Sequence, residues 1–204
     1  MKVIGIGKNY VNDLSEIAAL KTGHQLIFTK PDSSIVTENK DVPYPNITNE
    51  IVYEVELVAK IGKTCKDISE AEAASYISAL AVGIDYTATD VLKANRELKW
   101  PWALAKGFDG ASPISNFKPI SEFSNLNDIN FDLKINGEQK QIGNTSMMIY
   151  NFAEIISYVS KFMTLEPGDL FFTGTPAAGT GLIYKGDHLQ ASIEGELLLD
   201  FKMV

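Results

Sequence analysis

The sequence has very little of three residue types that carry much of protein chemistry: it holds one cysteine, one arginine and two histidines. The single Cys65 excludes an intramolecular disulfide framework and a cysteine metal cluster. Because Arg96 is the only arginine, we expect any anionic substrate group to be held mainly by lysine, backbone amides or a metal ion. The sequence therefore offers few groups outside its carboxylates and lysines for chemistry.

Long apolar runs and excess positive charge are also missing. No apolar stretch approaches the roughly 20 residues of a membrane span, and residues 1–7 are too short and glycine-rich for a signal peptide. A formal charge of −8 argues against nucleic acid or an anionic membrane as a partner. We therefore expect a soluble cytoplasmic protein that binds neither nucleic acid nor membrane.

What is present is typical of a globular protein, with 45% hydrophobic and 22% charged residues and no internal repeat. The length and the lack of a linker predict a single domain over residues 1–204. Hydrophobic periodicity and turn residues predict strands at the N-terminus, 51–61, 80–86, 129–136 and 139–142, and a C-terminal hairpin across Glu194 and Gly195. More strands than helices, without a regular βαβ rhythm, indicate a β-dominated α+β fold.

Four helices are expected. They cover residues 13–20, residues 69–79 behind a capping box at Ser69, residues 89–99 before Pro101, and a segment that begins at Asn151. The last has one apolar face at helical spacing, made of Phe152, Ile155, Ile156, Val159, Phe162 and Met163. Three prolines between residues 29 and 49 predict an irregular segment there.

Two carboxylates in the predicted strand 51–61 share one face. Side chains alternate across a strand, so Tyr53, Val55 and Leu57 point one way and Glu54 and Glu56 point the other. Neighbouring carboxylates repel each other unless a cation or water lies between them. A hard cation such as Mg²⁺, Mn²⁺ or Ca²⁺ would relieve this repulsion. The alternative is that this face is simply the solvated side of an antiparallel strand.

A third carboxylate, Asp85, ends the apolar run of residues 79–84. A lone acid there is costly to bury unless it is paired or binds a metal. It could also be a helix cap or a turn former, so the residue pattern alone leaves both interpretations open.

These segments, taken in order, resemble the fumarylacetoacetate hydrolase family, especially its small acylpyruvase, oxaloacetate-decarboxylase-like and 2-hydroxyhepta-2,4-diene-1,7-dioate isomerase-like members. The similarity covers nearly the whole chain, and no single short motif carries it. The matching segments are 6–10 (IGKNY), 29–31 (TKP), 53–57 (YEVEL), 61–63 (IGK), 84–90 (IDYTATD), 101–109 (PWALAKGFD), 136–138 (NGE), 143–149 (GNTSMMI), 165–169 (LEPGD) and 173–176 (TGTP).

The resemblance implies a mixed β-sandwich roll, a single catalytic domain and a homodimer. It implies that Glu54, Glu56 and Asp85 bind Mg²⁺ or Mn²⁺ and that a small 2-keto or 2,4-diketo acid chelates the same ion, which stabilises an enolate. The implied reactions are C–C hydrolysis of an acylpyruvate, enol–keto isomerisation or decarboxylation.

Further site residues follow from the same resemblance. Lys106 matches a family lysine near the substrate. The predicted substrate-binding residues are Lys8, Tyr10, Lys30 and Thr175, with a solvated surface lysine as the alternative for Lys30. The glycine-rich segment 173–181 lacks the end of a nucleotide-binding loop. We expect it to present Thr175 and backbone amides to a substrate oxygen, or else to be a flexible loop.

One departure from the family concerns water activation. Hydrolytic members carry a histidine followed three residues later by a glutamate, and here those positions hold Asp13 and Glu16. An aspartate with an ordinary pKa of about 3.9 is a weaker base than histidine. Asp13 and Glu16 could share a proton as a catalytic acid pair, or water activation is lost. His24 could substitute or be a surface residue, and His188 is expected to be structural.

Other departures concern the substrate pocket. Thr89 replaces a family arginine, Leu92 replaces a frequent glutamine, and Lys8 stands where many relatives have arginine. These changes predict a more apolar pocket without guanidinium contacts, and hence an altered substrate, an altered reaction or reduced activity. Two alternatives to an active enzyme remain open: a relative that binds metal and keto acid without turnover, and a purely structural domain.

Overall fold

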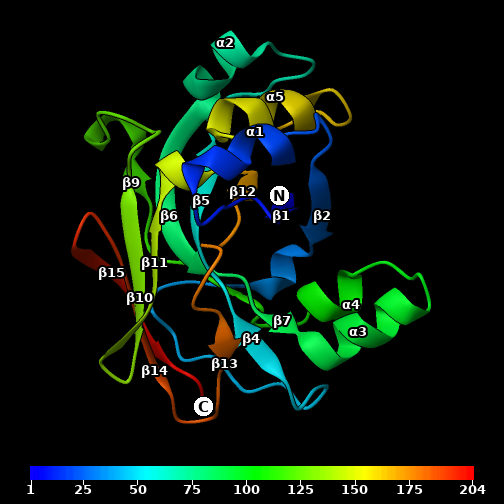
Figure 1. Cartoon of the computed structure of the whole chain (residues 1–204). Coiled ribbons are helices and arrows are strands. Elements are labelled where there is room, and N and C mark those ends of the chain that lie inside the picture. The colour runs from blue at the N-terminus through cyan, green and yellow to red at the C-terminus, as the bar shows by residue number, and fades with distance from the viewer.

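Four β-sheets, flanked by five short helices, build the molecule (Figure 1). The computed structural model describes residues 1–204. The strands are β1 (Val3–Gly7), β2 (Leu26–Lys30), β3 (Ile35–Val36), β4 (Ile51–Tyr53), β5 (Val55–Ile61), β6 (Ile77–Ile84), β7 (Thr87–Ala88), β8 (Ser112–Pro113), β9 (Lys118–Pro119), β10 (Asn130–Ile135), β11 (Glu138–Asn144), β12 (Leu170–Phe172), β13 (Gly181–Leu182), β14 (His188–Ile193) and β15 (Glu196–Lys202). The helices are α1 (Ile17–Leu20), α2 (Glu70–Ala73), α3 (Thr89–Glu97), α4 (Ala103–Lys106) and α5 (Phe152–Ser160).

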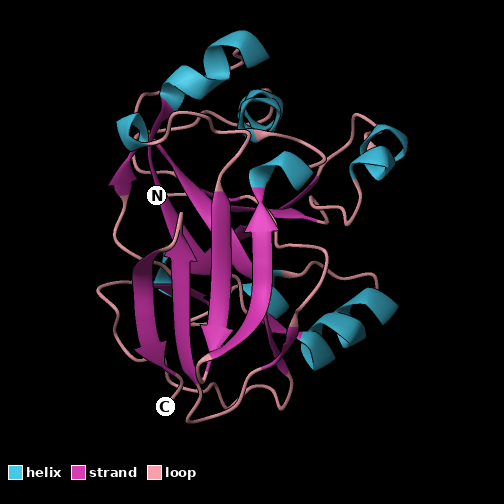
Figure 2. Cartoon of the chain, turned by 60° about the vertical axis from the view of Figure 1, so that its left-hand side comes forward, coloured by secondary structure: helices cyan, strands magenta, loops and turns pink.

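Two of the sheets form the main sandwich. The larger has the order β2-β1-β12-β5-β6-β9, and the four-stranded sheet, turned toward the viewer in Figure 2, has the order β11-β10-β14-β15. Leu57 and Val82 of the larger sheet share one buried cluster with Leu133, Ala191 and Leu199 of the smaller. Burial of these apolar side chains between the sheets is the main stabilising term. The β-dominated α+β class and the mixed sandwich are confirmed.

The predicted strand 51–61 is interrupted at Glu54, where the chain changes sheets. Before that residue, β4 pairs with β7 and β13; after it, β5 pairs with β6 and β12. The adjacent segment of the same chain also changes sheets, between β6 and β7, at Asp85. One hydrogen bond spans the crossing, from Asp85 N to Glu54 O at 2.8 Å. Both acidic residues therefore lie where two sheets part.

The two predicted hairpins are confirmed by their turn geometry. Asn136 and Gly137 have φ angles of 53° and 81°, and Glu194 and Gly195 have φ angles of 50° and 77°. Two successive residues with positive φ match the twist of the flanking strands in a two-residue hairpin. The hairpins join β10 to β11 and β14 to β15, and so build the four-stranded sheet.

The helix predictions are correct in place but not always in extent. In α5 the Asn151 side chain accepts from Glu154 N at 3.0 Å, and Glu154 accepts from Asn151 N at 2.9 Å. The helix ends at Ser160, so Phe162 does not continue its buried face and is 70% exposed.

The helix predicted for residues 69–79 is too long. Its capping box at Ser69 is present, yet α2 ends at Ala73 and a 3-10 turn follows it. From Ile77 the chain pairs with β5 as β6. Pairing in a buried sheet outweighs local helix propensity there. The segment 13–20 consists of a 3-10 turn and α1.

Asp169 links the first residues of the chain to the start of β12. Its carboxylate accepts from Lys2 N at 2.7 Å and from Glu166 N at 2.8 Å, and it pairs with Lys2 Nζ at 2.6 Å. Burial alone would raise the pKa of Asp169, but the bonds from Lys2 and the Glu166 amide outweigh burial and lower it.

We expect Asp169→Asn to lower the free energy of unfolding at neutral pH by about 2 kcal/mol, because hydrogen bonds to a charged group are lost. A lowered folded-state pKa stabilises the protein above the ordinary carboxyl pKa, and this contribution disappears as the pH falls through the folded value. Urea unfolding at pH 7 and at pH 3 measures the effect, and the variant should differ less from wild type at pH 3. An equal loss at both pH values would contradict the charge argument.

Candidate active site

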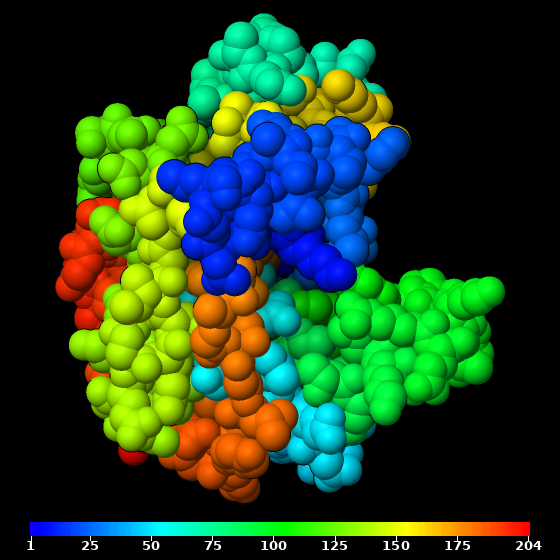
Figure 3. Space-filling model, viewed as in Figure 1, coloured from blue at the N-terminus to red at the C-terminus, as the bar shows by residue number.

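A cavity of about 390 Å³ opens between the end of β1, the sheet crossing, α3 and α4, and the segment that follows β12. In Figure 3 it lies beneath the N-terminal segment (blue) and beside α3 and α4 (green), where the surface is hollowed. Seven predicted site residues line it: Lys8, Tyr10, Glu54, Glu56, Asp85, Lys106 and Thr175. Residues more than 160 positions apart in the sequence thus meet in one pocket.

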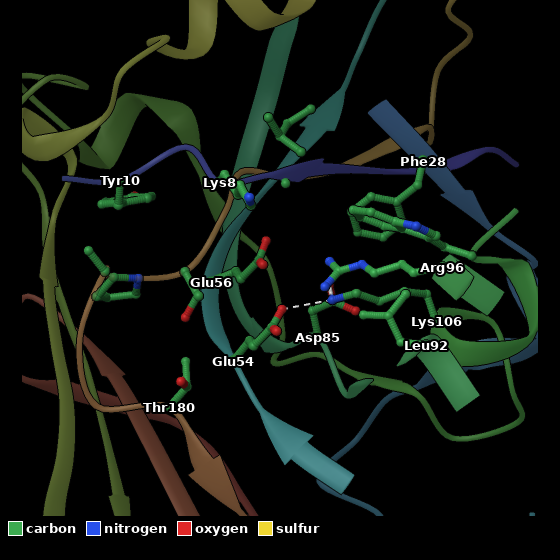
Figure 4. Close-up of a pocket in the computed structure, with 16 residues that line it drawn as sticks. Lys8, Tyr10, Phe28, Glu54, Glu56, Asp85, Leu92, Arg96, Lys106 and Thr180 are labelled. Atoms are coloured by element: carbon green, nitrogen blue, oxygen red, sulfur yellow. Dashed lines mark hydrogen bonds and ion pairs between the residues drawn. The ribbon is translucent and has the colours of Figure 1, made fainter. Parts of the chain in front are cut away.

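The three predicted metal ligands come together. One carboxylate oxygen from each of Glu54, Glu56 and Asp85 lies within 4.8 Å of the other two. Figure 4 shows Glu54, Glu56 and Asp85 grouped at the centre of the cavity. Glu56 is only 2% exposed and Asp85 is fully buried. The solvated-face interpretation is therefore wrong for this strand, and Asp85 is not the cap of α3, whose N-cap is Ala88.

Two buried lysines neutralise part of this negative charge. Lys106 Nζ lies 2.7 Å from Glu54 Oε2 and 2.5 Å from Asp85 Oδ2. Lys30 Nζ lies 2.5 Å from Asp85 Oδ1 and 2.9 Å from Ala111 O. Lys30 is not a solvated surface residue; it lies behind Asp85 and outside the cavity lining.

The electrostatic balance differs between the three acids. Burial raises the pKa of Glu54, although Lys106 opposes it, and raises that of Glu56 further because Asp85 and Glu54 add repulsion. Burial would also raise the pKa of Asp85, but Lys106 and Lys30 lower it below the ordinary value. The pKa of Lys106 is raised, since the carboxylates outweigh its own burial. Negative charge at Glu56 remains the least compensated.

The site fits a hard divalent cation. It offers three carboxylates, the donor type that Mg²⁺ and Mn²⁺ prefer. Two of them are held in place by neighbours: Gly174 N donates to Glu56 Oε2 at 2.8 Å, and Thr87 Oγ1 donates to Glu54 Oε1 at 3.1 Å. Such outer contacts orient ligands in metal sites. A cation here would also relieve the repulsion that raises the pKa of Glu56.

A network of amides shapes the wall opposite the lysines. Buried Asn9 donates to Tyr150 O at 3.0 Å and to Thr173 O at 2.9 Å, which fixes the chain beside Tyr10. Gln141 Nε2 donates to Thr175 Oγ1 at 2.9 Å, while its Oε1 accepts from Val55 N. Thr175 therefore has its own hydroxyl proton free for a group in the cavity.

Tyr10 brings a phenol to the same cavity. Its hydroxyl is buried without a hydrogen-bond partner. Burial, and next the charge of Glu56, raise the pKa of this phenol. Tyr10 therefore keeps its proton at neutral pH and can serve as a donor.

Asp13 and Glu16 are both exposed and do not line the cavity. The Asp13 carboxylate caps the 3-10 turn at Leu14–Glu16, accepting from Ser15 N at 2.8 Å and from Ser15 Oγ at 2.7 Å. These bonds lower its pKa, which makes Asp13 a still weaker base. His24 is an exposed residue.

Sequence reasoning missed three residues of the cavity wall near β2, α3 and α4. Phe28, Trp102 and Arg96 line the cavity together with Leu92. Helical spacing could have found Arg96, because it lies four residues after Leu92 and hence on the same face of α3. The expectation of a pocket without a guanidinium group is therefore wrong. Thr89 instead bonds to Glu50, away from the cavity.

Residues 2–200 match the family described as "Fumarylacetoacetate (FAA) hydrolase C-terminal". Among named relatives, the mitochondrial oxaloacetate tautomerase of Bos taurus is 38% identical over 201 residues, which cover 98% of this chain and 90% of that protein. The oxaloacetate tautomerase of Escherichia coli strain K12 is 33% identical over 198 residues, covering 97% of this chain and 90% of that protein.

Solved structures agree with the sequence matches. The fumarylpyruvate hydrolase of Pseudomonas aeruginosa, in complex with Mn²⁺ and pyruvate, superimposes with a TM-score of 0.89 at 33% identity, covering all of this chain and 90% of the other. The 5-carboxymethyl-2-hydroxymuconate delta-isomerase of Mycobacterium smegmatis gives 0.89 at 32% identity, with 100% and 78% covered. With its acidic cluster in the cavity, this chain belongs to the fumarylacetoacetate hydrolase family and is an enzyme of that family.

Proposed function

We propose that this enzyme uses Mg²⁺ or Mn²⁺, held by Glu54, Glu56 and Asp85, to interconvert the enol and keto forms of a small 2-keto acid. The supporting observation is the lining of the cavity, which joins the three carboxylates to Lys106 but contains no histidine. Proton movement within a keto acid needs charge stabilisation but no hydroxide. Hydrolysis needs a base that activates water.

Each residue of the site has a separate role in this reaction. A bound divalent ion supplies positive charge to the carboxylate and keto oxygens of the substrate. Lys106 adds a permanent charge beside the same oxygens, since its raised pKa keeps it protonated. Thr175 donates its hydroxyl proton, and Phe28 and Trp102 form an apolar wall that limits water. Lys30 positions Asp85 from behind.

The named relatives support a keto-acid substrate. Two are oxaloacetate tautomerases, and the fumarylpyruvate hydrolase was solved with Mn²⁺ and pyruvate. We infer from these names that a substrate of oxaloacetate size suits the cavity of about 390 Å³.

An assay of purified protein with Mg²⁺ or Mn²⁺ tests the proposal. The protein should accelerate the loss of the enol absorbance of oxaloacetate. It should cleave acetylpyruvate at least about a hundredfold less efficiently than it converts oxaloacetate, since a hundredfold is the lower end of the range for one general base. Efficient cleavage of acetylpyruvate, or release of CO₂ as the main reaction, would overturn the assignment. Stabilisation by Mg²⁺ plus oxalate without turnover of any substrate would instead indicate a binding-only relative.

Asp13 provides a sharper test of the same point. We expect Asp13→Asn to leave the tautomerase kcat/KM within about threefold, because a group with a catalytic proton contributes about a hundredfold or more. Steady-state rates of enol loss measure this, with Glu16→Gln assayed in parallel. A drop of a hundredfold in either variant, with unchanged thermal stability, would assign the segment 13–16 a direct role.

Three further expectations stay predictions: the single catalytic domain, the homodimer and the cytoplasmic location. No helix of the structure is long and apolar enough to cross a membrane. The relative from Bos taurus is a mitochondrial protein by name, so relatives do not all share one compartment.

A further inference from the structure

The only arginine of the chain differs from the two buried lysines of the site. Lys30 and Lys106 are both engaged by carboxylates. Arg96 lines the cavity, yet its guanidinium takes part in none of the ion pairs or side-chain hydrogen bonds of the structure. In a protein with a formal charge of −8, an unpaired guanidinium in an acidic cavity is available to an outside anion.

The surroundings of Arg96 hold it in place. Its guanidinium carbon lies 5.0 Å from the centre of the Trp102 ring, a cation–π contact. Trp102 in turn packs against Phe28, with ring centres 6.0 Å apart. Buried Asn95 stabilises the segment between α3 and α4, because its side-chain Nδ2 donates to Pro101 O at 3.0 Å and its backbone carbonyl accepts from Trp100 N at 2.8 Å. A guanidinium that is already stacked on a ring loses less conformational entropy when it binds a ligand than a mobile one does.

The position of Arg96 indicates which part of a ligand it meets. Figure 4 shows the side chain reaching from α3 toward the carboxylate cluster, across the part of the cavity next to Leu92. With a divalent ion bound, the site carries a net charge of one positive unit, because the ion and the two buried lysines outweigh the three carboxylates. The substrate carboxylate next to the keto group balances this charge. A second carboxylate on the substrate therefore needs another cation.

We propose that Arg96 binds the distal carboxylate of the substrate, so that the site selects 2-keto acids with a second carboxylate over those with an uncharged end. This inference rests on the proposed function and adds the substrate class to it. Leu92, one helical turn earlier, provides an apolar surface for the carbon chain between the two ends. Lys8 also lines the cavity without an ion pair and, like Arg96, is exposed, but no aromatic ring supports it.

A matched pair of ligands isolates the distal charge. 2-Oxoglutarate and 2-oxopentanoate share a five-carbon chain and the keto-acid end, and differ in a carboxylate or a methyl group at the other end. Calorimetry of the Mn²⁺-loaded protein gives both dissociation constants, and oxalate reports on the keto-acid end alone. We expect 2-oxoglutarate to bind wild type about tenfold more tightly, the lower end of the range for hydrogen bonds to charged groups.

Variants assign that preference to one residue. Arg96→Ala should remove the tenfold preference while oxalate binding stays within about twofold, and Arg96→Lys should keep part of it, since a point charge lacks the second hydrogen bond. Lys93→Ala is the control, because it removes a positive charge from the same helix outside the cavity. Lys8→Ala should change the preference less than Arg96→Ala.

The outcomes separate the two proposals. If oxalate binds but wild type does not prefer the dicarboxylate, or if only Lys8→Ala removes the preference, the role of Arg96 is refuted and the proposed function stands. Failure of oxalate to bind in the presence of Mn²⁺ overturns both. A loss of oxalate binding in both Arg96 variants would show that Arg96 supports the site as a whole, which also refutes the proposal.

Discussion

Glu56→Gln should lower kcat/KM for a keto-acid substrate by about a thousandfold or more, because a neutral amide cannot replace a carboxylate ligand of a divalent ion that contributes several kcal/mol to catalysis. The shape of the site should survive, since an amide oxygen can still accept from Gly174 N. Removing a buried negative charge that Asp85 and Glu54 repel should leave the metal-free protein at least as stable as wild type. The expected variant is thus folded, inactive and unresponsive to Mg²⁺.

Thermal unfolding with and without Mg²⁺ or Mn²⁺, together with the enol assay, checks this result. Glu97→Gln is the matched control, because it removes an exposed carboxylate of α3 that lies outside the cavity. Retention of the metal-dependent shift in melting temperature by Glu56→Gln would show that the ion binds elsewhere. Activity within tenfold of wild type would contradict the proposed ligand set.

Lys106→Met should separate the structural and chemical roles of the buried ammonium. Lys106 pairs with Glu54 and Asp85, and losing one partner of a buried ion pair costs about 3 kcal/mol. We therefore expect a marked loss of stability in the metal-free variant and a larger stabilisation by Mg²⁺ than in wild type, since the ion can neutralise the same carboxylates. Loss of the fixed charge beside the substrate should still reduce kcat by about a hundredfold.

Denaturant titrations with and without Mg²⁺, and kcat at saturating metal, give the two quantities independently. Lys185→Met serves as the control, because Lys185 is exposed and takes part in no ion pair. If Mg²⁺ restores full activity as well as stability, Lys106 acts only by balancing charge. If Mg²⁺ stabilises the variant no more than wild type, the ion and Lys106 do not share carboxylates.

Features set by local chemistry could be predicted from the sequence. The Asn136–Gly137 turn needs two residues that accept positive φ, and the cap of α5 needs the Asn151 and Glu154 pair. Alternation in the strand 53–57 was sufficient to place Glu54 and Glu56 on one face. The resemblance to the family then implied that Asp85 belongs to the same metal site, and the structure places Asp85 beside them.

Features set by distant contacts could not be predicted. The early end of α2 depends on pairing of β6 with β5, and the break at Glu54 depends on strands far along the chain. Gln141 reaches Thr175 only because β11 lies near the segment after β12. Arg96 is a different case: the departures from the family pattern lie at positions 89 and 92, whereas the positive charge lies one turn later on the same helix.

The crossing at Glu54 and Asp85 has a consequence for how the molecule responds to its ligand. β4, β7 and β13 form a small sheet of two- and three-residue strands, and the hydrogen bond from Asp85 N to Glu54 O lies at its junction with the larger sheet. An ion bound by all three carboxylates would act as a cross-link at the junction and stabilise the ordered state by mass action. The rigidity of the active site would then depend on the concentration of free metal, so that the ion would have a structural role as well as a catalytic one.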